Sequence, residues 1–206
     1  MTARRIVLGA ALAAVFLGTV AMAVEEPAFK PVLKDGAFEV RDYPALVVAE
    51  VTVSGDQKQA AGNGFRLLAG YIFGGNRTKQ SIAMTAPVAQ APASQKIAMT
   101  ALVTQIEGGK TWVVRFTMPS AYRLETLPTP NDPRVQLRQL PPTRFAVLRF
   151  SGLAPQDVVA ARTVELENQV TARRMTAVGP ASLAQYNPPW TPGFLRRYEV
   201  MIPIAR

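Results

Sequence analysis

The chain has 206 residues, of which 49% are hydrophobic and 18% are charged, and its formal net charge is +9. This length and composition are typical of one packed domain or two small half-domains, and they exclude a disordered chain. Within this chain the absence of cysteine and histidine excludes a Cys/His zinc site, an iron–sulfur cluster, a catalytic cysteine, a Ser-His-Asp triad and a histidine-ligated metal.

The first 23 residues have the pattern of a secretory signal peptide. Arg4 and Arg5 precede an uncharged apolar run over residues 6–20, and the Ala-Met-Ala sequence that ends at Ala23 matches an A-x-A cleavage site. An uncleaved amino-terminal anchor is the alternative, because the apolar segment is just long enough to span a bilayer. We expect cleavage after Ala23, a periplasmic or secreted protein, and no stable membrane insertion after cleavage.

The mature chain stays basic, because loss of Arg4 and Arg5 lowers the net charge only to +7. A basic surface can bind nucleic acid, anionic lipid or an acidic small molecule. Export argues against nucleic acid, and the cationic residues are scattered along the chain. Two interpretations remain open, an ordinary basic surface and a site for an anionic ligand.

A short repeat lies in the middle of the chain. Residues 81–88 (SIAMTAPV) return as residues 96–103 (KIAMTALV). Isoleucine, methionine and alanine occupy alternate positions in both copies, which is the period of a β-strand. We therefore predict a β-hairpin with these two segments as its arms.

A longer repeat relates the two halves of the chain. Residues 40–55 align without a gap on residues 137–152, at a constant offset of 97. Each copy has the pattern strand, proline turn, strand, Ser-Gly. The identical pairs are Arg41/Arg138, Pro44/Pro141, Ala49/Ala146, Ser54/Ser151 and Gly55/Gly152.

A helix is predicted after each copy of the long repeat. The first spans about residues 56–73, with Ser54 or Asp56 as the N-cap and Gly74-Gly75 as its end. The second has Pro155 in its first turn and continues to about residue 174.

Further strands are predicted over residues 111–118 and 197–204, with a linker between the halves at residues 128–133. Helices that follow pairs of strands predict an α+β fold, in which both helices pack against one curved sheet or open barrel. The chain thus looks like two copies of one β-β-α unit.

Motifs for catalysis are lacking. Acidic residues are sparse, and the sequence has no G-x-S-x-G, no phosphate-binding glycine loop and no cluster of carboxylates for a divalent metal. An enzyme would need Glu, Lys, Tyr, Ser or Thr in a tuned pocket. We therefore favour binding over catalysis.

The first predicted helix has an unusual face. Gly62, Phe65, Arg66, Ala69 and Gly70 recur at helical spacing, so small and large residues gather there around one cation. Each glycine inside a helix costs about 0.5–1 kcal/mol relative to alanine, so both need a reason. Close approach of a flat ligand is one reason, and close approach of the underlying sheet is the other.

A stiff aromatic loop precedes the last strand. Residues 186–194 (YNPPWTPGF) combine prolines with aromatic side chains, and Arg196-Arg197 follow. Such a loop suits a planar aromatic acid, which would stack on a ring and pair with a guanidinium group. Alternatively, Trp190 plugs the core.

These segments, in the same order, resemble the SOUL haem-binding family. The resemblance covers roughly residues 36–204 and is carried by five motifs: residues 38–44 (FEVRDYP), 64–76 (GFRLLAGYIFGGN), 82–88 (IAMTAPV), 186–189 (YNPP) and 197–200 (RYEV).

The resemblance implies a distorted antiparallel β-barrel built from two pseudosymmetric β-β-α halves, as in SOUL and GyrI-like proteins. The chain would divide into a signal peptide (1–23), an extension (24–35) and one SOUL domain (36–206), with half-repeats at about 36–127 and 134–206.

The family's implied function is binding of haem or another porphyrin, without catalysis, in an apolar cleft between the first helix and the loop before the last strand. The ligand is thus a small-molecule tetrapyrrole, and a role as carrier or buffer would follow. Carried over by position, with Arg196 added as an anchor for a propionate, the site residues are Gly62, Phe65, Arg66, Ala69, Gly70, Tyr186, Pro189, Trp190, Thr191 and Arg196.

Two departures from the family pattern bear on the ligand. Gly62, Gly70 and Thr191 stand where animal members place basic residues, so Arg66, Arg196 or Arg197 would have to pair with the propionates. A histidine ligand to iron cannot exist, so we expect haem and metal-free porphyrin to bind alike. The alternatives are a binding scaffold for another amphipathic or aromatic small molecule, and an enzyme that uses Glu or Tyr.

Overall fold

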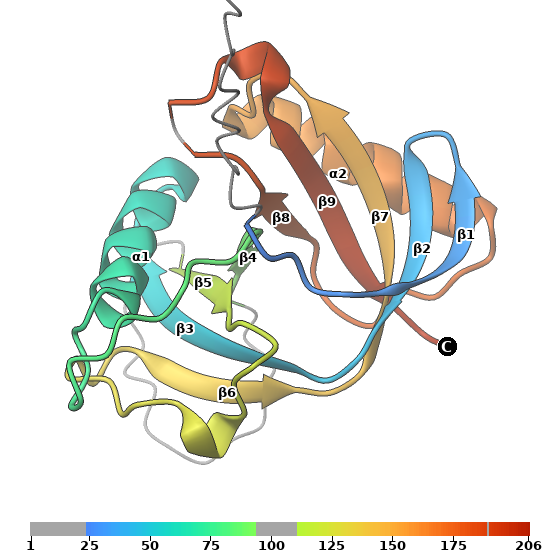
Figure 1. Ribbon diagram of the computed structural model, residues 1–206. Helices are drawn as coiled ribbons and strands as arrows, with labels where there is room; N and C mark the ends of the chain where they lie inside the picture. Colours follow the sequence, from blue (N-terminus) through green and yellow to red (C-terminus); the bar gives the residue numbers. More distant parts are fainter. Residues whose placement is uncertain (1–23, 94–110, 189) are drawn as a thin grey trace, which may run out of the picture.

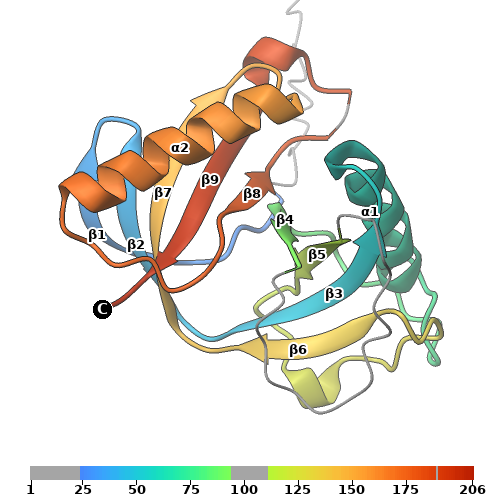
Figure 2. The ribbon, with the colours of Figure 1, turned by 180° about the vertical axis from the view of Figure 1, so that it is seen from behind.

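The computed structural model describes residues 24–93, 111–188 and 190–206. Its architecture is α+β, with one antiparallel sheet of nine strands curled into a half-barrel and two long helices (Figures 1 and 2). The elements in chain order are β1 (Lys30–Asp35), β2 (Phe38–Tyr43), β3 (Leu46–Ser54), α1 (Gln57–Ile72), β4 (Val88–Pro92), β5 (Thr111–Thr117), η1 (Leu124–Thr126), β6 (Gln136–Leu140), β7 (Thr143–Ser151), α2 (Gln156–Ala172), β8 (Ser182–Gln185), η2 (Gly193–Leu195) and β9 (Arg197–Ile204).

The predicted β-β-α pattern is confirmed in both copies of the long repeat, but the copies exchange strands. The sheet order is β1-β2-β7-β9-β8-β4-β5-β3-β6. Strand β2 of the first copy pairs with β7 of the second, and β3 pairs with β6. Each half of the sheet therefore contains one strand from each copy.

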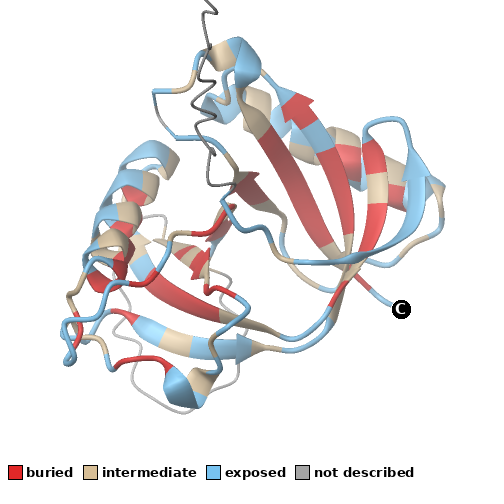
Figure 3. Ribbon diagram, viewed as in Figure 1, coloured by how far each residue is buried: buried red, intermediate tan, exposed pale blue. Residues whose placement is uncertain are grey.

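Each half of the sheet carries one helix on its outer face. Contacts join α1 to β3 and β5, and α2 to β7 and β9. Each of these four strands carries buried residues (Figure 3). The core below α1 is centred on Leu68, Tyr71 and Val114, and the core below α2 on Phe38, Leu166 and Val200.

The helix ends follow the predicted signals closely. Asp56 is the N-cap of α1, and its carboxylate accepts a hydrogen bond from the Gln59 amide at 2.8 Å. Pro155 is the N-cap of α2, one position before the first helical residue. The repeated Ser-Gly has a physical cause, because Gly55 and Gly152 both adopt a positive φ, +125° and +108°.

The predicted hairpin is only partly described. Its first arm is not a regular strand: Ser81 and Thr85 make isolated bridges to Phe73 and Glu25, and β4 begins only at Val88. Its second arm, residues 96–103, lies outside the described residues. The side chain of Thr85 donates a hydrogen bond to the Thr117 carbonyl, so the arm is held by single contacts rather than a ladder.

The predicted linker at residues 128–133 is fixed to the end of α1. The buried Tyr71 hydroxyl donates to the Pro128 carbonyl at 3.0 Å, and burial raises the pKa of Tyr71 to about 12. The Asn131 amide donates to the Gly75 carbonyl at 3.0 Å. Among the described residues, no helix is long and apolar enough to cross a membrane.

Candidate functional site

The outward face of α1 is bare around one arginine. Gly62, Arg66 and Gly70 are exposed, while Phe65 and Ala69 are half-buried. A Cβ built on Gly62 or Gly70 has no heavy atom within 4 Å. Close approach of the sheet therefore does not explain these two glycines.

A third glycine in α1 does meet the sheet. A Cβ on Gly64 would lie 2.6 Å from the Cβ of Val114 on β5. The sequence interpretation missed this position, although Gly64 falls at helical spacing from the buried Ala60 and Leu68. The helix thus has one glycine that packing requires and two that it does not.

The site residues on α1 differ in what holds them. Phe65 packs edge-on against Phe116, with ring centroids 5.4 Å apart, so it belongs partly to the core. The Arg66 guanidinium donates to the Asn63 side chain at 2.5 Å and to the Gly62 carbonyl at 3.3 Å. Beside it lies an open hollow of about 640 Å³ without an apolar side chain, lined by Asp56, Lys58, Gln59, Gly62, Asn63 and Arg66.

The loop between β8 and β9 presents apolar side chains to solvent. Trp190 is 83% exposed and Phe194 is 77% exposed. Trp190 therefore does not plug the core, which removes that alternative. Thr191 is half-buried, and its carbonyl accepts a hydrogen bond from Arg196 Nε at 2.7 Å. Pro189 lies outside the described residues.

The predicted site residues thus form two separate sets, one on α1 and one on the loop. Both views place the loop on the same side of the molecule as the amino-terminal end of α1 (Figures 1 and 2). The residues of the α1 set share one helix, and those of the loop set share one turn that ends in η2. Tyr186 is set apart from them, because its side chain points into a buried polar cluster.

This polar cluster was not predicted from the sequence. Arg41 and Glu199 are 4% and 1% exposed, and the Arg41 guanidinium donates to both carboxylate oxygens of Glu199, at 2.8 and 3.0 Å. The Tyr186 hydroxyl donates to Glu199 at 2.5 Å. Burial would lower the pKa of Arg41, but its hydrogen bonds and charge interaction with Glu199 raise it.

The side chains around this cluster complete its hydrogen bonds. Arg41 also donates to Glu39 at 2.7 Å and to the Tyr43 hydroxyl at 3.3 Å. Burial and the nearby Glu199 carboxylate raise the pKa of Tyr186. In the sequence, the repetition of Arg41 as Arg138 indicates that this arginine matters, but it does not identify its partners.

The equivalent arginine in the other half has a more open setting. Arg138 and Arg115 both pair with Glu50, at 2.7 and 2.6 Å, and the Arg138 side chain is 45% exposed. The two halves therefore use the repeated arginine differently. In one half it is buried and pairs with Glu199 and Glu39, and in the other it is half exposed and shares the Glu50 carboxylate with a second arginine.

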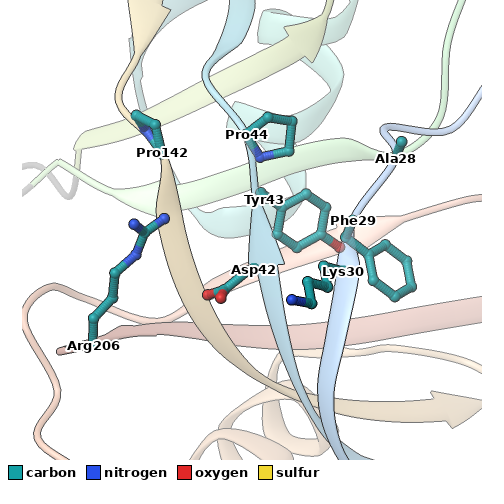
Figure 4. Close-up of a pocket in the computed structure, with 8 residues that line it drawn as sticks. All are labelled: Ala28, Phe29, Lys30, Asp42, Tyr43, Pro44, Pro142 and Arg206. Carbon is teal, nitrogen blue, oxygen red and sulfur yellow. The ribbon is translucent and has the colours of Figure 1, made fainter.

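A shallow hollow of about 370 Å³ lies where the two proline turns approach each other (Figure 4). Asp42 at its edge is held by Arg144 through two hydrogen bonds of 2.8 Å, which lower the pKa of this carboxyl group. Among the described residues, no group of three or more acidic residues could hold a metal ion. The hollow is lined by Ala28, Phe29, Lys30, Asp42, Tyr43, Pro44, Pro142 and Arg206.

Solved structures share the fold at low sequence identity. The EcmrR C-terminal domain matches with a TM-score of 0.59 and 9% identity, over 82% of this chain and 97% of that one. A hydrolase from Listeria innocua matches with a TM-score of 0.54 and 10% identity, over 84% and 94%. An uncharacterized conserved protein from the same organism has a TM-score of 0.55 and 12% identity, over 82% and 92%.

At these identities the likeness shows the fold alone. No curated protein matches the sequence. The family model described as SOUL heme-binding protein matches residues 24–203, nearly the whole of the described structure. The chain belongs to the SOUL haem-binding protein family.

Proposed function

We propose that this protein binds haem or a related tetrapyrrole, without catalysing a reaction, on the surface formed by α1 and the loop before β9. The binding residues would be those carried over from the family motifs, and the protein would serve as a carrier or buffer. Membership of the SOUL family supports the class of ligand. The bare face of α1 around Arg66 supports the proposed location of the binding surface.

The observation that carries the proposal is the bare face around Arg66. Gly62 and Gly70 lie one turn to either side of it, and neither has a neighbour that would explain the missing side chain. A flat macrocycle could lie against this backbone while Arg66 pairs with a propionate. Trp190, 83% exposed, offers a ring for stacking from the loop.

Iron coordination is not part of the proposed mechanism. The chain has no histidine or cysteine, and tyrosine coordinates iron as a phenolate. The Tyr186 hydroxyl is committed to Glu199, and burial raises its pKa, so the phenolate is disfavoured. Apolar contact and propionate pairing would then hold the ring, and they act equally on metallated and metal-free porphyrins.

The decisive test fills the bare face of α1. In absorbance titrations of the purified protein, Gly62→Leu is expected to weaken binding of haem and of metal-free protoporphyrin at least about tenfold, a loss of 1.4 kcal/mol. The matched control is Ala160→Leu, an added side chain at an exposed position of α2, which should change neither affinity. Trp190→Ala should weaken both ligands about fivefold through lost stacking.

Each result bears on a distinct part of the proposal. Unchanged affinity in Gly62→Leu would show that the ring does not lie on α1. A preference for haem over the metal-free ring of more than about tenfold would contradict binding without an iron ligand.

A second candidate is favoured by the polar hollow beside Gly62. Lys58 and Arg66 line it together with Gln59, Asn63 and the carboxylate of Asp56. The two cations could pair with the acidic group of another amphipathic or aromatic small molecule as well as with a propionate. Competition between such an anion and protoporphyrin, with both weakened by Gly62→Leu, would favour the second candidate.

We further propose that the protein is exported and that residues 1–23 are removed. The basic start, apolar run and A-x-A motif support this. The intact mass of protein recovered from the periplasm or medium should correspond to a chain that starts at Val24. A mass that includes Met1 or residues 6–20 would instead support the uncleaved anchor.

A further inference from the structure

Residues 24–29, here called the strap, cross one face of the sheet. In Figure 1 the strap is the blue segment in front of β9, β7 and β2, whereas α2 lies behind these strands; in Figure 2 the order is reversed. Its amino-terminal end is fixed by Glu25, whose carbonyl accepts from the Ala86 amide at 2.9 Å and whose carboxylate accepts from the Ser120 amide at 2.8 Å.

Two side chains of the strap contact the buried polar cluster and its neighbours. The Glu26 carboxylate pairs with Arg197, whose guanidinium lies 3.5 Å above the ring of Tyr186. The Phe29 ring lies 5.4 Å from the ring of Tyr43, beside which Figure 4 shows it, and 4.4 Å from the Arg41 guanidinium. The strap thus presents a carboxylate and an aromatic ring to a surface of arginines and tyrosines, in which Arg41 is already paired with Glu199 and Glu39 while Arg197 is paired with the strap's own Glu26.

The strap is held weakly enough to be displaced. Of its residues only Pro27 is half-buried, and the others are exposed. The Glu26 and Arg197 side chains are 46% and 26% exposed, and a pair so accessible contributes only about 0–1 kcal/mol. Few buried contacts and little regular structure are typical of segments that open locally.

The Arg197 guanidinium has unused capacity for a carboxylate. Glu26 accepts from its Nη2, while its Nε is buried without a hydrogen-bond partner among the described residues. A guanidinium binds a carboxylate best through two parallel hydrogen bonds. Arg144 shows this geometry in the same protein, with Nε and Nη2 each 2.8 Å from the Asp42 carboxylate.

We propose that Arg197 and Tyr186, together with the adjoining Arg41 and Tyr43, form a binding site for a small aromatic carboxylate, which the strap occupies as an internal ligand. Glu26 takes the place of the ligand's carboxylate and Phe29 takes the place of its ring. A free carboxylate can use both Nε and Nη2 of Arg197, which the tethered Glu26 does not. This site lies apart from the bare face of α1 but shares Tyr186 with the residues proposed for tetrapyrrole binding, so Glu26→Gln, which changes none of those residues, tests it independently.

The proposal is tested with 4-phenylbutyrate as the probe and the neutral 4-phenylbutanol as its matched control, in NMR titrations of the purified protein. Glu26→Gln removes the competing carboxylate and is expected to tighten phenylbutyrate binding about two- to fivefold, since the competent fraction of the site rises. Arg197→Gln is expected to weaken it at least about tenfold. The alcohol cannot pair with Arg197, so it should bind the wild type more weakly than phenylbutyrate does and should not lose affinity in Arg197→Gln.

A control variant separates this effect from a general loss of charge. Glu165→Gln removes the Arg162–Glu165 pair of α2, which is similarly accessible at 44% and 42%, and should leave phenylbutyrate binding unchanged. Equal affinity in the wild type and Glu26→Gln, or no binding by Glu26→Gln, would overturn the proposal. Should Arg197→Gln not fold, the comparison of Glu26→Gln with Glu165→Gln still decides it.

Discussion

Replacing Arg41 with methionine is expected to lower the free energy of unfolding by about 3–5 kcal/mol, the range for breaking a buried ion pair from one side. The substitution leaves the Glu199 carboxylate, 1% exposed, without its guanidinium partner. It also removes donors to Glu39 and Tyr43. Urea unfolding followed by circular dichroism at neutral pH measures the change.

The repeat supplies a matched control for this experiment. Arg138→Met changes the equivalent arginine, but Arg138 is 45% exposed and its partner Glu50 keeps Arg115, so the expected cost is about 0–1 kcal/mol. Similar losses in the two variants would show that burial does not distinguish the halves. The double variant Arg41→Met/Glu199→Met should recover part of the loss, because no buried charge is left unpaired.

This asymmetry also bears on catalysis. If the protein were an enzyme that uses Glu or Tyr, Glu199 and Tyr186 would be candidate catalytic residues. The Glu199 carboxylate, however, already accepts hydrogen bonds from Arg41 and Tyr186. A general base must reach the proton that it abstracts. The cluster is therefore better explained as a polar core that joins β2 and β9 to the residue after β8, which is consistent with the proposed non-catalytic function.

Local signals predicted the elements well. Asp56, Pro155 and the repeated Ser-Gly sequences mark helix starts and strand ends that depend on short-range backbone chemistry. The alternation in residues 81–88 wrongly predicted a regular strand there. A period of two is compatible with an extended chain, but it does not show which strand the segment would pair with. There the chain makes isolated bridges at Ser81 and Thr85 before β4 begins at Val88.

Pairings between distant residues could not be predicted. The repeat shows that the halves are alike, but it does not show that β2 and β6 each join the other half. Arg41 and Glu199 are separated by 158 positions, and nothing in either segment marks the other as its partner. The sequence likewise predicts only an extension over residues 24–35, because Glu26 and Phe29 contact residues that lie far from them in the chain or on another strand.

Gly64→Ala is expected to destabilise the protein by about 1–3 kcal/mol, the range for overpacking a core. The new Cβ would lie 2.6 Å from Val114 atoms that cannot turn away, so α1 or β5 must move. Thermal or urea unfolding would measure this, and Val114→Ala in the same chain should relieve part of the strain beyond the sum of the single changes.

Substitution of the two outward glycines is expected to have the opposite effect on stability from Gly64→Ala. Gly62→Ala and Gly70→Ala should each stabilise the protein by about 0.5–1 kcal/mol, because alanine favours the helix and its methyl group meets no neighbour. Destabilisation by either change would mean that the face is already filled. If stability rises while protoporphyrin affinity falls, the glycines sacrifice helix stability to keep the face flat, as a surface shaped for a planar ligand requires.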